Sequence, residues 1–340
     1  MTKKILYIGN DLRVDSFTAT YISFLSKMLR EEGFKVKTAS AKNNKLIRLT
    51  EMLCLIMKFH STTDIVLIDT YGATNFYYAY LVGRLSKIYK IPYVPILHGG
   101  NLPERLDKDP KFSKRLFGNA FVNIAPSNFL KSEFESRDFD RLKLIPNSID
   151  LQNYPYKERS TFRPKLLWVR RFQKRYNPKM AIKVLELLSE EFEDAELCMI
   201  GPEKDGCMQE CKRLVKKKDL NVKFTGKLKK KVWADLSKEY DFFINSTTID
   251  NTPISVIESM SLGLPIISTN VGGMPVLIDH LQDGVLVDSG DSEKMYSEIK
   301  NIIENPDIGQ AIAFNARKKA ESFGWINVRK DWLEVINNVG

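Results

Sequence analysis

The chain has 340 residues, of which 43% are hydrophobic and 28% are charged, and its formal net charge at pH 7 is +10. This length exceeds what one ordinary hydrophobic core holds and suits two domains of about 150 residues each. The composition is that of a folded globular protein, which excludes extensive disorder. The positive charge raises the question of nucleic-acid binding, because lysine and arginine supply the sequence-independent part of such binding.

The basic residues form two runs in the second half, at 216–218 and 227–231. No aromatic stacking platform accompanies either run, and no nucleic-acid-binding motif is present, so nucleic acid is not an expected partner. A basic face also attracts anionic membranes. Peripheral contact with a membrane and a plain solvated face are both compatible with these runs.

The cysteines and the N-terminus bear on the cellular compartment. Cys54, Cys198, Cys207 and Cys211 fall at predicted buried positions, without C-x-x-C spacing and without a histidine near enough to complete a zinc site. The first apolar segment has the length of a strand, and no later run approaches the length of a membrane span. We therefore expect a cytoplasmic protein without a metal.

In the first half, branched apolar runs alternate with amphipathic helices, a pattern typical of a parallel sheet. Gly9 and Asn10 begin the loop after the first strand. Strands are expected at 3–9, 34–39, 64–69, 92–97 and 121–128, and helices at 17–29 and 45–58.

His98 is the candidate for chemistry in this half. It follows the strand at 92–97 and precedes two glycines, so its imidazole can face a ligand uncovered by a neighbouring side chain. A histidine held by backbone groups of the loop is the structural alternative. His60 and His280 lack such glycines, and we interpret them as ordinary.

The second half repeats the alternation of strands and helices. Residues 154–164 are polar, contain two prolines and are expected to link the halves. Strands are then predicted at 165–169, 195–201 and 221–227, two amphipathic helices at 291–322 and a last helix at 325–338.

Residues 241–277 carry the densest set of signals. A buried strand at 241–245 ends in a polar loop, at the end of the strand where open α/β sheets bind ligands. Asn251 and Thr252 are cap-type residues, and Pro253 suits a first helical position. A helix that begins there presents free amides and a positive dipole end to an anion.

Two further features of this segment indicate a ligand. Glu258 lies between apolar Ile257 and Met260 on the predicted helix, so it is expected to be half buried. A carboxylate in that position requires hydrogen-bond donors, and sugar hydroxyls are suitable ones. Gly272 and Gly273 follow the next strand and allow a backbone to approach a bulky ligand.

Residues 241–290, and within them the segment VIESMSLGLPIISTNVGG, resemble the signature of family 4 of the retaining glycosyltransferases. The resemblance implies the GT-B fold, an α/β arrangement of two Rossmann-like, doubly wound domains facing a central cleft. It places an acceptor-side domain at residues 1–155, with a last helix at 325–340 crossing back onto it, and a donor-binding domain at 156–324.

The resemblance also implies roles for single residues. Glu258 matches the carboxylate that binds the nucleotide ribose, and Asp250 stands where a longer Glu usually contacts the donor sugar. His98 matches a histidine near the reacting sugar carbon, where imidazole can bind the sugar or stabilise departing negative charge. Other matches to donor-binding positions are Asn251, Thr252, Pro253, Ile254, Gly9, Gly201, Thr225 and Gly226.

A diphosphate leaving group requires fixed positive charge, and arginine provides it through a rigid fork. Arg171 aligns with the phosphate-binding arginine of the family, whereas Tyr176 and Asn177 replace its Lys-Gly pair. Three nearby residues can substitute for the missing lysine, and which of them does so is left open: Arg170, Lys174 and Lys179.

These resemblances imply a metal-independent retaining glycosyltransferase of the hexosyltransferase type. Its donor is expected to be a nucleoside diphosphate sugar, and its acceptor a hydroxyl of a glycan that can be lipid-linked, in cell-envelope or surface polysaccharide synthesis. No cofactor is expected. Asp138 and Asp140 spell the D-x-D of metal-dependent glycosyltransferases but follow a charged helix end, so we interpret them as a solvated turn. The alternatives are a sugar-nucleotide epimerase of the same fold and a non-catalytic basic module that binds nucleic acid or membrane.

Overall fold

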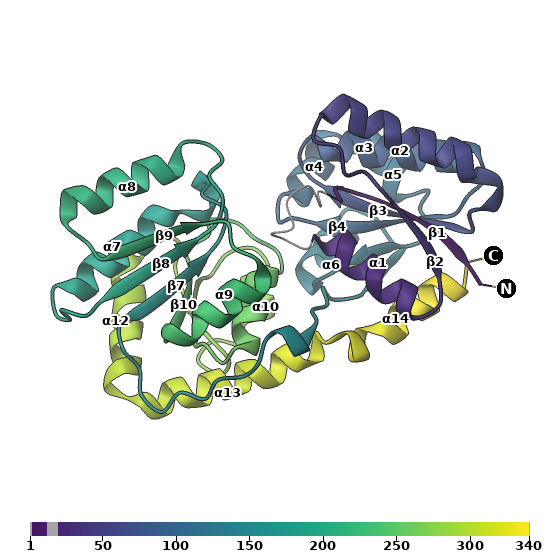
Figure 1. Ribbon diagram of the computed structural model, residues 1–340. Coiled ribbons are helices and arrows are strands. Elements are labelled where there is room, and N and C mark those ends of the chain that lie inside the picture. Colours follow the sequence, from purple (N-terminus) through teal and green to yellow (C-terminus); the bar gives the residue numbers. More distant parts are fainter. Residues whose placement is uncertain (1, 12–19, 340) are drawn as a thin grey trace. The chain divides into compact units, whose positions relative to one another are not determined.

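The computed structural model describes residues 2–11 and 20–339, and the chain forms two compact units (Figure 1). The first unit comprises Met1–Ser148 and Trp325–Gly340, and the second comprises Ile149–Gly324. The sequence-predicted boundary after residue 155 therefore falls inside the second unit. Part of the helix predicted at 17–29 lies outside the described residues.

The first unit is a six-stranded sheet, in the order β2-β1-β3-β4-β5-β6, with every pair of neighbouring strands parallel. Helices α2 and α3 cover one face, and α1 and α14 lie on the other (Figure 1). The elements are β1 (Lys4–Ile8), α1 (Tyr21–Glu31), β2 (Lys35–Ala39), α2 (Lys45–Phe59), η1 (His60–Thr62), β3 (Ile65–Tyr71), α3 (Asn75–Ile88), β4 (Tyr93–His98), α4 (Leu102–Lys108), α5 (Pro110–Phe117), β5 (Asn123–Ala125), α6 (Asn128–Glu135), β6 (Leu142–Leu144) and α14 (Trp325–Asn337).

The second unit is also a six-stranded parallel sheet, in the order β12-β11-β10-β7-β8-β9. Its elements are η2 (Leu151–Asn153), β7 (Lys165–Val169), η3 (Lys174–Tyr176), α7 (Pro178–Ser189), β8 (Glu196–Ile200), α8 (Cys207–Lys218), β9 (Val222–Gly226), α9 (Lys230–Leu236), η4 (Ser237–Glu239), β10 (Phe242–Asn245), α10 (Ile254–Ser261), β11 (Ile266–Thr269), α11 (Met274–Leu277), β12 (Val285–Val287), α12 (Ser292–Glu304) and α13 (Pro306–Ser322).

The second unit has a hydrophobic core on each side of its sheet. One core packs α7, α8 and α12 against the strands, and the other packs α9, α10 and α13. Because both faces are covered, the central strands are apolar throughout: Phe242, Phe243 and Ile244 of β10 are fully buried. This is the burial that the continuous apolar runs of the sequence predict.

The segment predicted as a polar linker, residues 154–164, instead packs against the second unit. Arg159 is 5% exposed and donates hydrogen bonds to the backbone oxygens of Lys157, Ser237, Tyr240, Leu262 and Gly263. Burial lowers its pKa to about 10. An arginine can be buried when its donors are satisfied in this way, so polarity alone predicts a linker wrongly.

One cysteine prediction was wrong. Cys198, Cys207 and Cys211 are buried as predicted, but Cys54 on α2 is exposed. Its neighbours Met52 and Ile56 form the buried stripe of the helix, and position 54 lies away from them.

Candidate active site

The strand order of the second unit reverses between β7 and β10. From this point β8 and β9 extend the sheet in one direction, and β11 and β12 extend it in the other. The loops that follow the two central strands therefore diverge, which opens a crevice at the carboxyl edge of the sheet where ligands bind in such folds. Arg170 directly follows β7, and residues 246–251 follow β10.

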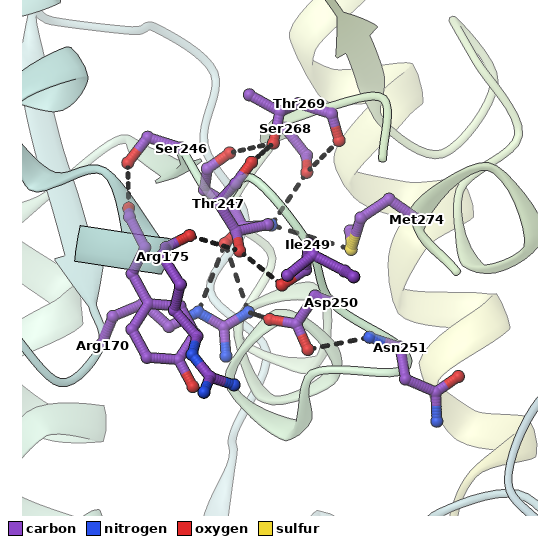
Figure 2. A network of polar contacts seen from close by, with 12 residues as sticks. Arg170, Arg175, Ser246, Thr247, Ile249, Asp250, Asn251, Ser268, Thr269 and Met274 are labelled. Atoms are coloured by element: carbon purple, nitrogen blue, oxygen red, sulfur yellow. Dashed lines mark hydrogen bonds and ion pairs between the residues drawn. The ribbon is translucent and has the colours of Figure 1, made fainter. Parts of the chain in front are cut away.

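Arg170 is held in place by Asn245, at the end of β10, and by Asp250, in the loop that follows β10 (Figure 2). Its Nε and Nη2 both donate to Asn245 Oδ1 at 3.2 Å, and Nη2 forms an ion pair with Asp250 Oδ2 at 3.0 Å. Its guanidinium lies over the ring of Tyr176, 5.4 Å from the centroid. Among the described residues no hydrogen bond reaches Nη1, so the guanidinium retains donors for an anion.

A second layer of hydrogen bonds fixes the loops around Arg170 (Figure 2). Asn245 donates through Nδ2 to Ser268 Oγ at 2.9 Å, which ties β10 to β11. Thr247 donates to the backbone oxygen of Ile249 at 2.9 Å, and Thr269 donates to that of Thr247 at 2.6 Å. Because these side chains are buried and bonded, the guanidinium is oriented in advance of any ligand.

Asp250 lies in the loop between β10 and α10, and the glycine turn after β11 packs against this loop. Asp250 Oδ1 accepts from the amide of Asn251 at 2.9 Å, and the backbone oxygen of Asp250 accepts from the amide of Gly273 at 3.0 Å. A Cβ on Gly272 would come within 2.2 Å of that oxygen. The close backbone approach that the sequence assigns to a ligand is thus made by the protein's own loop.

Glu258 is more deeply buried than predicted, with 4% of its surface exposed. Its Oε1 accepts from Tyr154 Oη at 2.5 Å and from Lys230 Nζ at 2.5 Å. Burial and the neighbouring carboxylate raise the pKa of Tyr154 well above that of an ordinary phenol, so Tyr154 remains a donor. No hydrogen bond from the described residues reaches Oε2, which leaves one carboxylate oxygen for a ligand hydroxyl.

Helix α10 begins at Ile254, one residue later than predicted, with Pro253 at the N-cap position. In the described structure the side chain of the N-cap residue Pro253 accepts no hydrogen bond from the free amides of α10, in contrast to α6, where the side chain of Ser127 accepts from the amide of Leu130. Ser255 Oγ, in the first turn of α10, is buried and has no hydrogen-bond partner among the described residues. Uncapped amides and an unpartnered hydroxyl suit an anion.

Gly201 lies next to Arg170, and two other predicted donor-binding residues, Thr225 and Gly226, lie beside Gly201. The amide of Gly201, after β8, donates to the backbone oxygen of Gly226 at 2.9 Å, and Thr225 Oγ1 donates to the same oxygen at 3.0 Å. A Cβ on Gly201 would come within 1.7 Å of the backbone oxygen of Arg170. Glycine is therefore required at position 201, because any side chain there would clash with the main chain of Arg170.

The remaining basic candidates are placed differently. The side chains of Arg171 and Lys174 are exposed. Lys179 on α7 forms an ion pair with Glu210 of α8 at 2.7 Å, and this contact raises its pKa. The structure thus brings Arg170, but not these three, into the network of Figure 2.

Asn177 occupies the position where the family has the glycine of its Lys-Gly pair. Its backbone is left-handed, with φ +42° and ψ +57°. Asparagine adopts this region more readily than most residues with a side chain. Position 177 therefore has a backbone conformation that glycine also adopts readily.

In the first unit, His98 lies at the carboxyl end of β4 and is 7% exposed. Its Nε2 is 3.0 Å from Asp69 Oδ1, the oxygen that also accepts from Tyr7 Oη at 2.8 Å. The imidazole stacks on Tyr71, with 4.9 Å between ring centroids, and meets Tyr21 edge to face at 5.5 Å. Asp69 and the flanking rings thus fix the ring plane, rather than backbone groups of the loop.

Gly9 and Asp69 lie at the point where the strand order of the first sheet reverses, between β1 and β3. A Cβ on Gly9 would come within 2.4 Å of Asp69 Oδ2. Glycine is required there because the carboxylate packs directly on the main chain. Asn10, in the same loop, accepts from Arg48 Nη1 at 2.9 Å.

Sequence reasoning missed Asp69, Tyr154 and Lys230. The sequence predicts Asp69 only as part of the strand at 64–69. Its place at the carboxyl end of a strand, like that of His98, is a signal that could have identified it. Tyr154 and Lys230 are 104 and 28 residues from Glu258. No local signal pairs residues that far apart, but the predicted burial of Glu258 did require such donors.

Asp138 and Asp140 are exposed in the turn between α6 and β6. Over residues 2–11 and 20–339, no group of three or more His, Cys, Asp or Glu side chains is arranged to hold a metal ion. In the same described part of the chain, no helix has the length and apolarity needed to cross a membrane.

Comparison with known sequences bears on the second unit. Residues 155–319 match the family model described as glycosyl transferases group 1. An uncharacterized glycosyltransferase of Haemophilus influenzae is 24% identical over 165 residues, which are 46% of this chain and 44% of that protein. Spore coat protein SA of Bacillus subtilis is 29% identical over 182 residues, 50% of this chain and 48% of that protein. The match thus spans less than half the length of these relatives.

Comparison with solved structures bears on the fold of the whole chain. Sucrose-phosphate synthase from Thermosynechococcus elongatus has a TM-score of 0.81 at 15% identity and covers 98% of both chains. HepE of Anabaena, in complex with UDP-glucose, has a TM-score of 0.76 at 19% identity and covers 98% of this chain and 99% of its own. The chain therefore has the α/β GT-B fold, and most of its second unit matches the model described as glycosyl transferases group 1.

Proposed function

We propose that this protein transfers a sugar from a nucleoside diphosphate donor to a hydroxyl acceptor. The observation that carries the proposal is Arg170, oriented by Asn245 and Asp250 at the strand-order reversal of the family's own domain. Its remaining donors suit the diphosphate, because a guanidinium binds phosphate oxygens in a paired geometry. HepE, which shares the fold, is in complex with UDP-glucose, so a UDP-sugar is the first donor to test.

The other residues of the site are proposed to bind different parts of the donor. Glu258 Oε2 is proposed to accept the ribose hydroxyls, and the uncapped start of α10 with Ser255 is proposed to meet the phosphates. Asp250 is proposed to contact the transferred sugar. Of the two adjacent arginines we assign the phosphate to Arg170, because Arg171 is exposed.

The reaction is proposed to retain the anomeric configuration and to need no metal. Arg170 and the amino end of α10 supply fixed positive charge toward the departing diphosphate, which is the role a cation would otherwise have. In the first unit, His98 is proposed to bind the sugar, with Asp69 fixing its ring.

The acceptor is proposed to be a glycan hydroxyl in envelope or surface polysaccharide synthesis. The basic side chains at 216–218 are exposed, so contact with an anionic membrane on the cytoplasmic side remains part of this proposal.

The proposal is tested by incubating the protein with a panel of nucleotide sugars and measuring release of the nucleoside diphosphate, with and without EDTA. Release from one donor that is unchanged by EDTA is expected, and NMR of the transferred sugar should show the donor's anomeric configuration. Conversion of the donor to its epimer would instead identify an epimerase. Strongly salt-dependent DNA or vesicle binding without turnover of any donor would identify a basic binding module.

A further inference from the structure

A cavity lies in the first unit, at the opposite end of the strands from His98. It has a volume of about 490 Å³ and opens beside the start of β1 and of the edge strand β2. This volume lies within the range of small-molecule sites, roughly 300–1,000 Å³. We call it the edge cavity, and it is separate from the reversal point at Gly9 and Asp69.

The wall of the edge cavity is apolar. Ile5, Leu6 and Val36 line it from β1 and β2, and Phe34 and Phe59 contribute aromatic surface. Ile5, Leu6 and Val36 are buried, whereas the two phenylalanines are only half buried. An apolar body that covered these rings would gain the free energy of removing them from water.

The rim of the edge cavity is positively charged. Lys4, Arg30, Lys35 and Lys37 line it, and no acidic residue does. Lys37 Nζ lies 3.4 Å from the centroid of the Phe59 ring, and Arg30 donates to the backbone oxygen of Val36 at 3.0 Å.

Carboxylates of the described residues do not neutralise the charges of these lysines. Among residues 2–11 and 20–339, the amino groups of Lys4, Lys35 and Lys37 form no ion pair with a carboxylate. The nearby carboxylate of Asp64 is instead bonded to the backbone amide of Lys4 at 2.6 Å. Three unpaired ammonium groups around an apolar cavity attract an anion that carries an apolar chain.

We propose that the edge cavity binds an anionic amphiphile, with a phosphate or carboxylate head group at the lysines and an apolar chain against Phe34 and Phe59. The head group meets Lys35 and Lys37 on β2, and the chain lies against the half-buried rings of Phe34 and Phe59. This ligand is distinct from the nucleotide sugar, and the inference does not depend on the proposed function.

The test uses dodecyl phosphate below its micelle concentration, titrated into the full chain by calorimetry. Saturable binding at one site is expected, and affinity in a series of alkyl phosphates should rise about fourfold with each added CH₂ group until the cavity is filled. Inorganic phosphate and the neutral amphiphile dodecyl maltoside should bind at least tenfold more weakly.

The double variant Lys35→Glu/Lys37→Glu should lose at least tenfold in affinity, and Lys35→Gln/Lys37→Gln should show a smaller loss. The matched control is Lys111→Glu, an exposed lysine on α5 outside the cavity, which should bind as the parent does. Circular dichroism melts verify that all variants are folded. Equal affinity in the parent and the Lys35→Glu/Lys37→Glu variant, or equal binding of the neutral amphiphile, would overturn the inference.

Vesicles of phosphatidylglycerol and of phosphatidylcholine distinguish the source of the amphiphile. Binding to the anionic vesicles that the same double variant abolishes assigns the cavity to a membrane lipid. Binding of the alkyl phosphate alone assigns it to a free amphiphile, and binding of neither contradicts the proposal.

Discussion

At the scale of single residues, the structure chooses between two adjacent arginines that the sequence leaves equivalent. Side chains alternate across an extended chain, so residues 170 and 171 point to opposite sides after β7. Arg170 meets Asn245 and Asp250, whereas Arg171 is exposed. The sequence predicted that one of these arginines binds the donor's phosphates, but the pairing of β7 with β10 decides which one does.

Replacing Arg170 by Ala should lower kcat/KM for the donor by about 30-fold or more, the effect of losing about 2 kcal/mol of charge-assisted hydrogen bonding. Arg171→Ala should change it less than about threefold. Steady-state kinetics measure both, with Arg213→Ala, an exposed arginine on α8, as the matched control. Similar losses in the Arg170 and Arg171 variants would refute the assignment.

Tyr21 gives a prediction about stability and pH. Burial raises its pKa from 10 to about 12, so folding favours the protonated phenol. This stabilisation is complete below pH 10 and is lost as the pH rises from 10 toward 12. At pH 11 the loss in unfolding free energy is about 1 kcal/mol, relative to pH 8.

The Tyr21→Phe variant isolates this effect, because it keeps the ring and removes the titrating group. Urea unfolding at pH 8 and pH 11 should show a smaller loss of stability in the variant than in the parent. Parallel losses in the two proteins would mean that Tyr21 does not ionise on unfolding as proposed.

At the scale of elements, sequence patterns located the strands and the helix after β10 to within a few residues. They could not identify what residues 154–164 contact, because Arg159 and Tyr154 are satisfied by groups some 80 to 104 residues away. The pairing of Asp69 with His98, 29 residues apart, could not be predicted from the sequence for the same reason. Local signals predict elements, but the partners of buried polar groups depend on the packed fold.

Gly201 tests how the loop after β8 supports Arg170. Gly201→Ala places a Cβ against the backbone oxygen of Arg170, 1.7 Å away in the present geometry. We expect a loss in unfolding free energy about 2 kcal/mol or more beyond that of the control Gly206→Ala. Gly206 also has a positive φ, +80°, but nothing lies within 4 Å of its added Cβ, so its cost is the backbone strain alone.

Denaturant titration measures both glycine variants, and donor affinity should fall only in Gly201→Ala. Equal destabilisation by the two substitutions would show that the loop moves away from the Arg170 backbone oxygen with little loss of unfolding free energy.

At the scale of the whole molecule, the sequence predicted two Rossmann-like units and a resemblance to a glycosyltransferase family, since strand–helix alternation and the 241–290 signature are local features. The solved structures with this fold agree over nearly the full chain. The edge cavity was not predictable, because it arises where residues of β1, β2 and the end of α2 meet at the edge of a sheet. The donor and the amphiphile would occupy different sites, so each can be tested while the other is absent.

The most direct test of the central claim is a crystal structure of the protein soaked with the nucleoside diphosphate that binds it best. We expect the diphosphate within hydrogen-bonding distance of Arg170 and the first turn of α10, with a ribose hydroxyl on Glu258 Oε2. A nucleotide bound away from the carboxyl ends of β7 and β10, with Arg170 still paired only to Asn245 and Asp250, would contradict it.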